Sequence, residues 1–359
     1  EAVAIGGGRI VALGSTSALS TLHADHTVDL GGRTVIPGLI DGHTHLDGTS
    51  TNLAYFADCH VPPNNTIPEI LANLTAHAAA NPDEPWVIGQ GSFMLREKLV
   101  EGRLPSLDEM DEAVPDRPAL IRAGAHISAV NSKALEVLGI DDDFVPPAGA
   151  HVVRDENGRP TGELIEMYWF IKVGGYDLVR TKEAVAAMAA RLSSFGITSV
   201  QDQFPSATGL RAYQQLRREG RFPLRISFTI HTPTVAAVEQ FLKMGIETGF
   251  GDEFLKVGAA KFFVDGGITG AAGAFYDDYS HMPGNKGHLK LSREDVFTMV
   301  RLLNDAGLQI STHVVGDLAL DTLLDAYEAH PDSWGKRHRL EHAGHLCMTP
   351  ERIGRMVKM

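Results

Sequence analysis

The chain has 359 residues, of which 43% are hydrophobic and 21% are charged, as in ordinary globular proteins. A formal net charge of -13 argues against nucleic acid or an anionic membrane surface as a partner, since both would repel an acidic protein. No apolar run approaches the roughly 20 residues that a membrane-spanning helix needs. We expect a cytoplasmic protein that meets a small-molecule substrate and, as one option, a second copy of itself in a homodimer.

Residues 1–34 contain short β-prone runs, AIGGGRIVALGS and TVDLGGRTV, each broken by glycines. This pattern is typical of β-hairpins with tight turns. We predict a small β-domain here, one part of a β-sandwich.

Residues 35–46, VIPGLIDGHTHL, form the most informative stretch of the chain. The branched apolar run predicts a buried strand, and His43 and His45 follow it. Residues two apart on an extended chain project to the same side, so both imidazoles would enter one cavity. Two nitrogen donors suit a transition metal. The alternative is a turn that carries two ordinary surface histidines.

The region of about 47–165 is too long for a simple loop in a compact domain. Helical patterns cover 67–80 and 132–138, between proline-rich turns. We predict an inserted subdomain over the mouth of the main fold. His126 and Glu166, in AGAHISAVNSKAL and GRPTGELIE, are candidates for its pocket.

From residue 180 onward, helical and strand patterns alternate, which predicts an α/β fold with a parallel sheet, either a closed barrel or doubly wound. With the His-Thr-His strand counted first, six of the eight strands of a (β/α)₈ barrel are present. The predicted helices are 182–195, 208–219, 234–245, 292–306 and 317–329, and the strands between and after them are GITSVQD, LRISFTI, FLKVGAAKFFVD, LQISTHVVGD and HRLEHAG.

Lys261 lies in an otherwise apolar strand, AAKFFV, and should be buried. Desolvation would lower the pKa of the amine and leave it able to react with CO₂. The resulting carbamate is an anionic ligand that could bridge two metals. An ion pair with Asp265 is the alternative. His313, and Glu341 with His342, end the next two strands, where barrels of this kind place their active sites.

Seven ordered motifs together resemble the amidohydrolase superfamily. They are VIPGLIDGHTH, AHISAVNSKAL, GRPTGELIE, GITSVQD, KFFVDG, THVVGD and RLEHA. Within it they are most similar to the amidohydrolase-3, or YtcJ-like, branch, which includes N-substituted formamide deformylases. The resemblance implies a (β/α)₈ barrel over 35–359 beside a β-sandwich, with a site for one or two divalent metals, usually zinc.

The resemblance also implies a ligand set. His43 and His45 would hold the first metal, and Lys261, once carboxylated, would bridge to the second. His313 and His342 would hold the second metal.

The implied reaction is hydrolysis of an amide or other non-peptide C–N bond by a metal-activated hydroxide. His313 and Lys261 are then the expected catalytic residues. His126, Glu166 and Asp202 are the expected contacts to substrate.

Three departures from the family pattern bear on the function. The aspartate that ends the eighth strand has no counterpart, Gln201 precedes Asp202 where the family has histidine, and the N-terminal sandwich lacks its opening strand. We expect a fragment that lacks segments at both ends. The alternative function is a non-catalytic binding or regulatory protein on an amidohydrolase scaffold.

Overall fold

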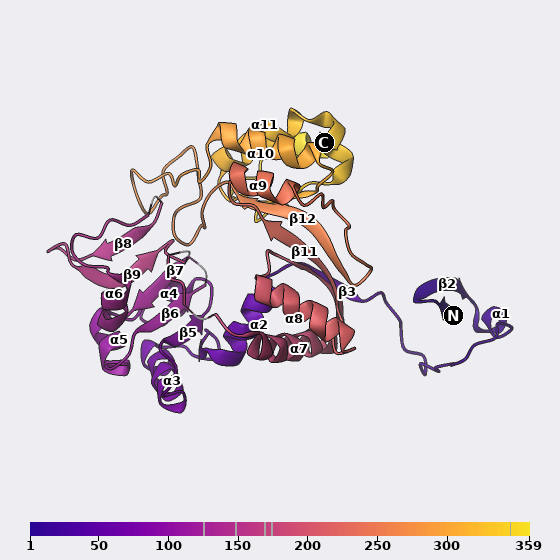
Figure 1. Cartoon of the computed structure of the whole chain (residues 1–359), viewed down its shortest axis with the longest axis horizontal. Helices are drawn as coiled ribbons and strands as arrows, with labels where there is room; N and C mark the ends of the chain where they lie inside the picture. Colours follow the sequence, from indigo (N-terminus) through magenta and orange to yellow (C-terminus); the bar gives the residue numbers. More distant parts are fainter. Residues whose placement is uncertain (125, 148, 169, 174, 345) are drawn as a thin grey trace. The chain divides into compact units, whose positions relative to one another are not determined.

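The computed structural model describes residues 1–359 except 125, 148, 169, 174 and 345 and the side chain of 333. It contains two compact units, Glu1–Gly38 and Leu39–Met359 (Figure 1). No helix in the described part of the chain has the length and apolar character needed to cross a membrane.

The first unit contains one antiparallel hairpin, β1 (Ala2–Gly6) with β2 (Arg9–Gly14). Gly7 and Gly8 form its turn, with φ of 58° and 75°, which a two-residue hairpin turn requires and glycine adopts freely. A single helical turn, α1 (Thr16–Leu19), follows.

The second predicted hairpin is wrong. Gly31 and Gly32 do form a turn with positive φ, but no strand flanks it. Residues 21–38 are exposed throughout, so no apolar face is available to pack strands there. One hairpin is therefore all that the described residues show of the predicted sandwich.

The second unit is built on a parallel sheet of six strands in the order β14-β13-β12-β11-β10-β3. These are the six strands that the sequence predicted after residue 38. The bounds are β3 Leu39–Thr44, β10 Ile197–Asp202, β11 Arg225–His231, β12 Leu255–Phe263, β13 Ile310–His313 and β14 Arg339–Glu341.

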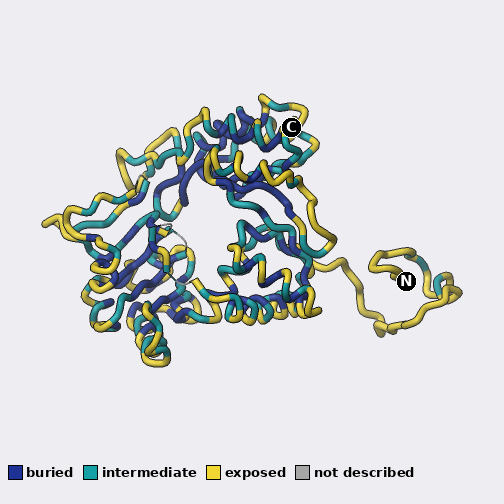
Figure 2. Tube along the Cα trace, in the orientation of Figure 1, coloured by how far each residue is buried: buried dark blue, intermediate teal, exposed yellow. Residues whose placement is uncertain are grey.

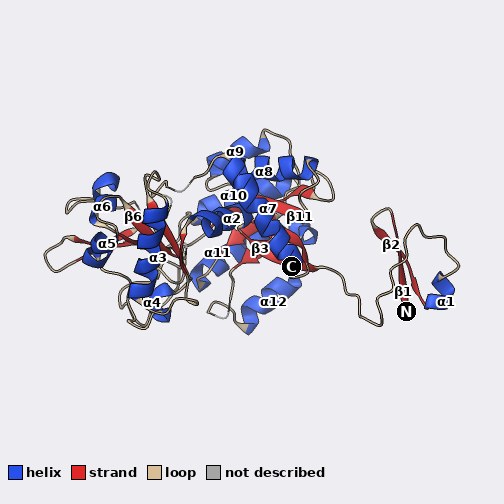
Figure 3. Cartoon of the chain, turned by 90° about the horizontal axis from the view of Figure 1, so that it is seen from below, coloured by secondary structure: helices blue, strands red, loops and turns tan. Residues whose placement is uncertain are grey.

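Helices alternate with these strands and cover the outside of the sheet (Figures 1 and 3). α7 packs against α2 and α8, and α10 packs against α9 and α11. Most begin at a side-chain cap, such as Asp177 before α7 and Ser292 before α10, which satisfies free backbone N–H groups. The bounds are α2 Leu46–Tyr55, α7 Leu178–Ser194, α8 Ala207–Arg218, α9 Val235–Leu242, α10 Arg293–Asp305, α11 Asp317–Glu328, the 3₁₀ helix η1 Pro331–Lys336, and α12 Pro350–Lys358.

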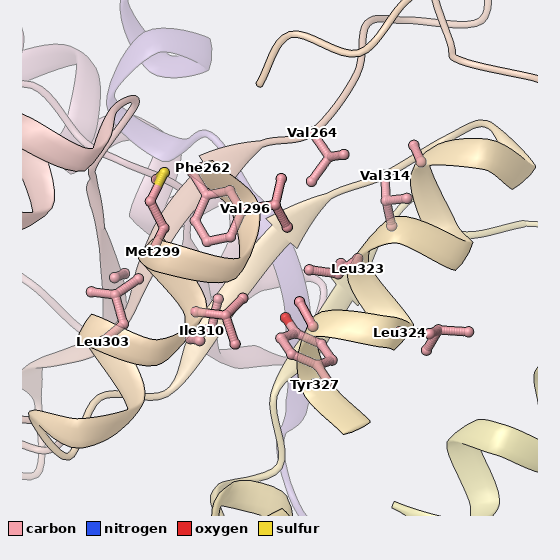
Figure 4. Close-up of a cluster of buried hydrophobic side chains, with 14 of the residues drawn as sticks. Phe262, Val264, Val296, Met299, Leu303, Ile310, Val314, Leu323, Leu324 and Tyr327 are labelled. Carbon is pink, nitrogen blue, oxygen red and sulfur yellow. The ribbon is translucent and has the colours of Figure 1, made fainter. Parts of the chain in front are cut away.

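The core lies between the strands and these helices, where the tube in Figure 2 is dark blue. Figure 4 shows part of it, with Phe262 of β12 and Ile310 of β13 against Met299 of α10 and Leu323 of α11. All four side chains are fully buried. This packing holds the strand ends, and the side chains that follow them, in place.

The sheet curls, so that side chains bring its two outer strands into contact. Arg339 of β14 donates from Nη2 to the carbonyl of Gly42 in β3, at 2.8 Å. The result is a half-barrel of the TIM type. One prediction fails here: Leu39 and Ile40 of β3 are 52% and 74% exposed rather than buried. The reason is that β10 is the one strand that pairs with β3 in the described structure.

A second, mixed sheet occupies residues 57–165, in the order β4-β5-β6-β7-β9-β8. The sequence had indicated only its helical pieces. The buried face of α3, through Ile67, Ile70 and Leu74, packs in one core cluster with β4 and β5. The bounds are β4 Ala57–Cys59, α3 Ile67–Ala80, β5 Val87–Gly91, α4 Leu95–Lys98, α5 Leu107–Ala113, β6 Ala119–Ala123, β7 Ile127–Val130, α6 Ser132–Leu138, β8 His151–Arg154 and β9 Pro160–Ile165.

Candidate metal centre

Four of the predicted ligands are histidines that lie side by side at the carboxyl ends of β3, β13 and β14. The ring centre of His43 is 5.4 Å from that of His45 and 4.6 Å from that of His342. His313 is 4.8 Å from His342. His342 has a φ of 70°, a costly conformation for a residue with a side chain, and such strain is common at functional sites.

Burial favours the neutral form of three of these imidazoles. Desolvation, together with smaller effects of His43 and Lys261, lowers the pKa of His45 and of His342 to about 4. Desolvation likewise holds the pKa of His313 well below its usual value. A neutral imidazole is the form that binds a metal.

Lys261 lies in the middle of the same site and is 1% exposed. Its Nζ has no hydrogen-bond partner in the described structure and lies 5.4 Å from the ring centre of Phe263. Desolvation lowers its pKa to about 7, against the opposing effect of the Glu341 charge. A large fraction of the amine is therefore neutral near pH 7.

The alternative ion pair between Lys261 and Asp265 is wrong. Asp265 accepts backbone N–H bonds from Ala274 at 2.9 Å, Val315 at 3.0 Å and Gly316 at 2.7 Å. These bonds tie the end of β12 to the start of α11. The carboxylate is thus committed to backbone amides.

Glu341 joins the site through its carboxylate. Oε2 accepts from His43 Nδ1 at 2.6 Å, and Oε1 accepts from Ser311 Oγ at 2.8 Å and Arg339 Nε at 2.6 Å. Burial alone would raise the pKa of Glu341, but these hydrogen bonds hold it well below the usual range. The carboxylate is therefore ionised although the residue is only 4% exposed.

The chemical types of the donor atoms in this site suit a transition metal. It offers neutral imidazole nitrogens and two buried nitrogens without hydrogen-bond partners, His43 Nε2 and Lys261 Nζ. Buried polar atoms of this kind are rare, and a missing ion is one explanation. Among the described residues, however, no three His, Cys, Asp or Glu side chains already converge on one point as a metal ion would require.

The inserted subdomain brings two of the predicted substrate contacts to this site. His126 Nδ1 lies 2.8 Å from Glu166 Oε1, and the His126 ring centre is 6.5 Å from that of His313. Glu166 Oε2 also forms an ion pair with Lys290 Nζ at 3.2 Å. Burial opposes ionisation of Glu166, but His126 and Lys290 lower its pKa to about 2. The ionised Glu166 thus holds His126 by a hydrogen bond beside the histidines.

Asp202, the third predicted substrate contact, has another role in this structure. It is fully buried, and its two oxygens accept from Leu46 N and Tyr213 Oη, both at 2.6 Å. Desolvation raises its pKa to about 8. Both oxygens are engaged within the protein, so Asp202 holds the start of α2 and the middle of α8 instead.

One histidine of this site was not predicted from the sequence. His231 ends β11 and pairs in register with Lys261. Its ring centre lies 5.0 Å from that of Phe204 and 5.7 Å from that of Phe263. Desolvation, and then Lys261, lower its pKa to about 4. The available signal was its position, directly after the predicted strand LRISFTI.

Comparison with known proteins assigns this chain to a family. The model of the amidohydrolase family, Amidohydro_3, matches residues 26–359. The chain belongs to the amidohydrolase family. It is 30% identical to the N-substituted formamide deformylase of Arthrobacter pascens over 96% of its length, and 27% identical to YtcJ of Bacillus subtilis over all of it.

A solved structure shows the same fold. It is that of an uncharacterized metal-dependent hydrolase from Pyrococcus horikoshii, with a TM-score of 0.68 at 22% identity over 99% of this chain and 68% of that one. The amidohydrolase chain described here spans 61% to 68% of the length of the curated relatives that it matches over nearly its whole length.

Proposed function

We propose that this amidohydrolase is a metal-dependent hydrolase that cleaves an amide or related non-peptide C–N bond. The observation that carries the proposal is the group of adjacent histidines at the carboxyl ends of β3, β13 and β14. TIM-type barrels place their active sites at this end. The family match over 26–359 and the likeness to N-substituted formamide deformylase support the class of bond.

In the proposed site, His43 and His45 would hold one divalent metal, and His313 and His342 would hold another. Lys261, in its carboxylated form, would serve as the ligand shared by both. Nitrogen donors with an anionic oxygen suit zinc. A bound zinc ion would lower the pKa of water to about 7 and polarise a carbonyl oxygen.

The chain's own residues supply orientation. Gly266 O accepts from His313 Nε2 at 3.2 Å, which leaves Nδ1 of the neutral ring free to act as an acceptor. His126, held by Glu166, approaches from the inserted subdomain and would contact the substrate. Because Glu166 is ionised, its carboxylate accepts a hydrogen bond from His126 Nδ1, and this bond orients the ring.

The first experiment measures metal content and turnover together. The chain is purified without chelator, its zinc per chain is determined by elemental analysis, and hydrolysis of a panel of N-substituted amides is followed. We expect one or two zinc ions per chain. His43→Ala should lose metal and lower turnover by at least about 100-fold, the loss expected for a group that acts directly in catalysis.

His23→Ala is the matched control, because His23 is an exposed histidine of the first unit. It should keep wild-type metal content and activity. Retained turnover in His43→Ala would refute the assignment. Bound zinc without turnover on any C–N substrate would favour a non-catalytic binding protein.

A further inference from the structure

Glu341 has a contact that its neighbours in sequence do not explain. It lies on β14, one outer strand of the sheet, yet it bonds His43 on β3, the other outer strand, 298 positions away along the chain. The Oε2–Nδ1 distance of 2.6 Å is typical of a charge-assisted hydrogen bond.

The chemistry of this bond determines which nitrogen of His43 is free. An ionised carboxylate only accepts, so Nδ1 of His43 must carry the hydrogen. In the neutral ring, Nε2 is then left with its lone pair. Nε2 is also the atom of His43 that is buried without a hydrogen-bond partner in the described structure.

The carboxylate itself is held from two further directions. Ser311 Oγ and Arg339 Nε both donate to Oε1, at 2.8 and 2.6 Å. Arg339 also donates from Nη2 to the carbonyl of Gly42, the residue before His43. One arginine therefore holds both the carboxylate and the backbone that carries the imidazole. Rotation of either would break a hydrogen bond to a charged group.

We propose that Glu341 is a positioning residue that sets the tautomer and direction of His43, so that Nε2 faces the metal site. The proposal rests on the metal site of the proposed function. Carboxylates that orient metal-binding histidines in this way raise the basicity of the free nitrogen, and their loss typically weakens metal binding by about 10–100-fold.

The test measures zinc affinity of the full chain by competition with a chromophoric chelator. Glu341→Gln should bind Zn²⁺ about 10–100-fold more weakly than wild type, with an unchanged thermal midpoint of the metal-free protein within a few degrees. Glu84→Gln is the matched control, since Glu84 also pairs with an arginine, Arg180, at 2.8 Å. This control should bind zinc as wild type does.

A second readout does not depend on the variant. Side-chain ¹H–¹⁵N NMR of the metal-free wild type, with the signals of His43 assigned by His43→Asn, should show Nδ1 protonated and Nε2 unprotonated. The opposite tautomer would overturn the proposal even if Glu341→Gln failed to fold. Unchanged zinc affinity in a folded Glu341→Gln would overturn the role of Glu341 and leave the proposed function standing. A wild type that binds no zinc would overturn both.

Discussion

Lys261 is the residue at which burial and function conflict most directly. Its aliphatic part packs well in β12, but its amine is buried without a hydrogen-bond partner in the described structure. A buried polar group in that state costs about 1–3 kcal/mol of stability. A residue that only filled space would be apolar, so the amine is explained best by a chemical role.

We therefore predict that Lys261→Met stabilises the metal-free chain while it lowers the zinc content. Methionine has a similar length and no group to desolvate, so the gain should be about 1–3 kcal/mol in the free energy of unfolding. Urea unfolding after chelator treatment measures the first effect, and elemental analysis measures the second.

Lys256→Met provides the control for this substitution, since Lys256 lies on the same strand and is exposed. This control should keep the free energy of unfolding and the zinc content of wild type within experimental error. A less stable Lys261→Met would mean that the amine has a stabilising partner. Its burial would then not point to a chemical role.

At the scale of secondary-structure elements, Asp202 connects β10 to two helices. Its carboxyl accepts from the first backbone amide of α2 and from Tyr213 in α8. α2 begins directly after His45, so this bond also fixes the backbone of a predicted ligand. Burial raises the pKa of Asp202 to about 8 in the folded chain, against 3.8 for the ordinary group.

This shift predicts a pH dependence of stability. Between about pH 4 and pH 8 the folded chain keeps a proton that the unfolded chain releases, so the stabilising contribution is complete below pH 4. It falls as the pH rises toward 8, by up to about 1.4 kcal/mol per pH unit. Asp202→Asn, which is neutral at every pH, should remove this slope.

The measurement is the free energy of unfolding at several pH values for wild type and Asp202→Asn. Asp116→Asn, at an exposed position, should keep the wild-type slope. Equal slopes in wild type and Asp202→Asn would show that Asp202 is ionised throughout this range.

At the scale of the whole molecule, the proposed ligands join segments that are far apart in sequence. His43 lies in β3 and His45 directly follows it, whereas His313 ends β13 and His342 directly follows β14, at the opposite side of the sheet order. Metals held by these residues and sharing Lys261 as a ligand would connect both outer strands of the half-barrel. Metal binding should thus stabilise the fold as a unit.

We predict that Zn²⁺ raises the thermal midpoint of chelator-treated protein in a saturable manner. At 100 times the dissociation constant the stabilisation should reach about 2.7 kcal/mol, the value for one site that exists only in the folded state. Differential scanning fluorimetry at increasing Zn²⁺ measures it. Mg²⁺ should have little effect, because it prefers oxygen ligands. Equal shifts with both ions would indicate nonspecific binding.

Much of the barrel follows from local patterns in the sequence. The six parallel strands and the five helices α7 to α11 were predicted within a few residues, and the ends of α3 and α6 were predicted without error, whereas α2 was missed. Local signals suffice there, because apolar periodicity selects the element and a capping residue ends it, such as Thr66 before α3. The same patterns placed His43, His45, Lys261, His313 and His342 at strand ends or within a strand.

The tertiary structure decided what depends on neighbours distant in sequence. The apolar run at residues 35–40 predicted burial, but its position at the sheet edge leaves Ile40 exposed. Asp265 was a possible ion-pair partner of Lys261 and Asp202 a possible substrate contact, and both are engaged by groups from other segments. The bond between Glu341 and His43 exists only because the sheet curls until its outer strands meet. Periodicity describes which face a residue occupies, whereas strand order and curvature determine which residues it faces.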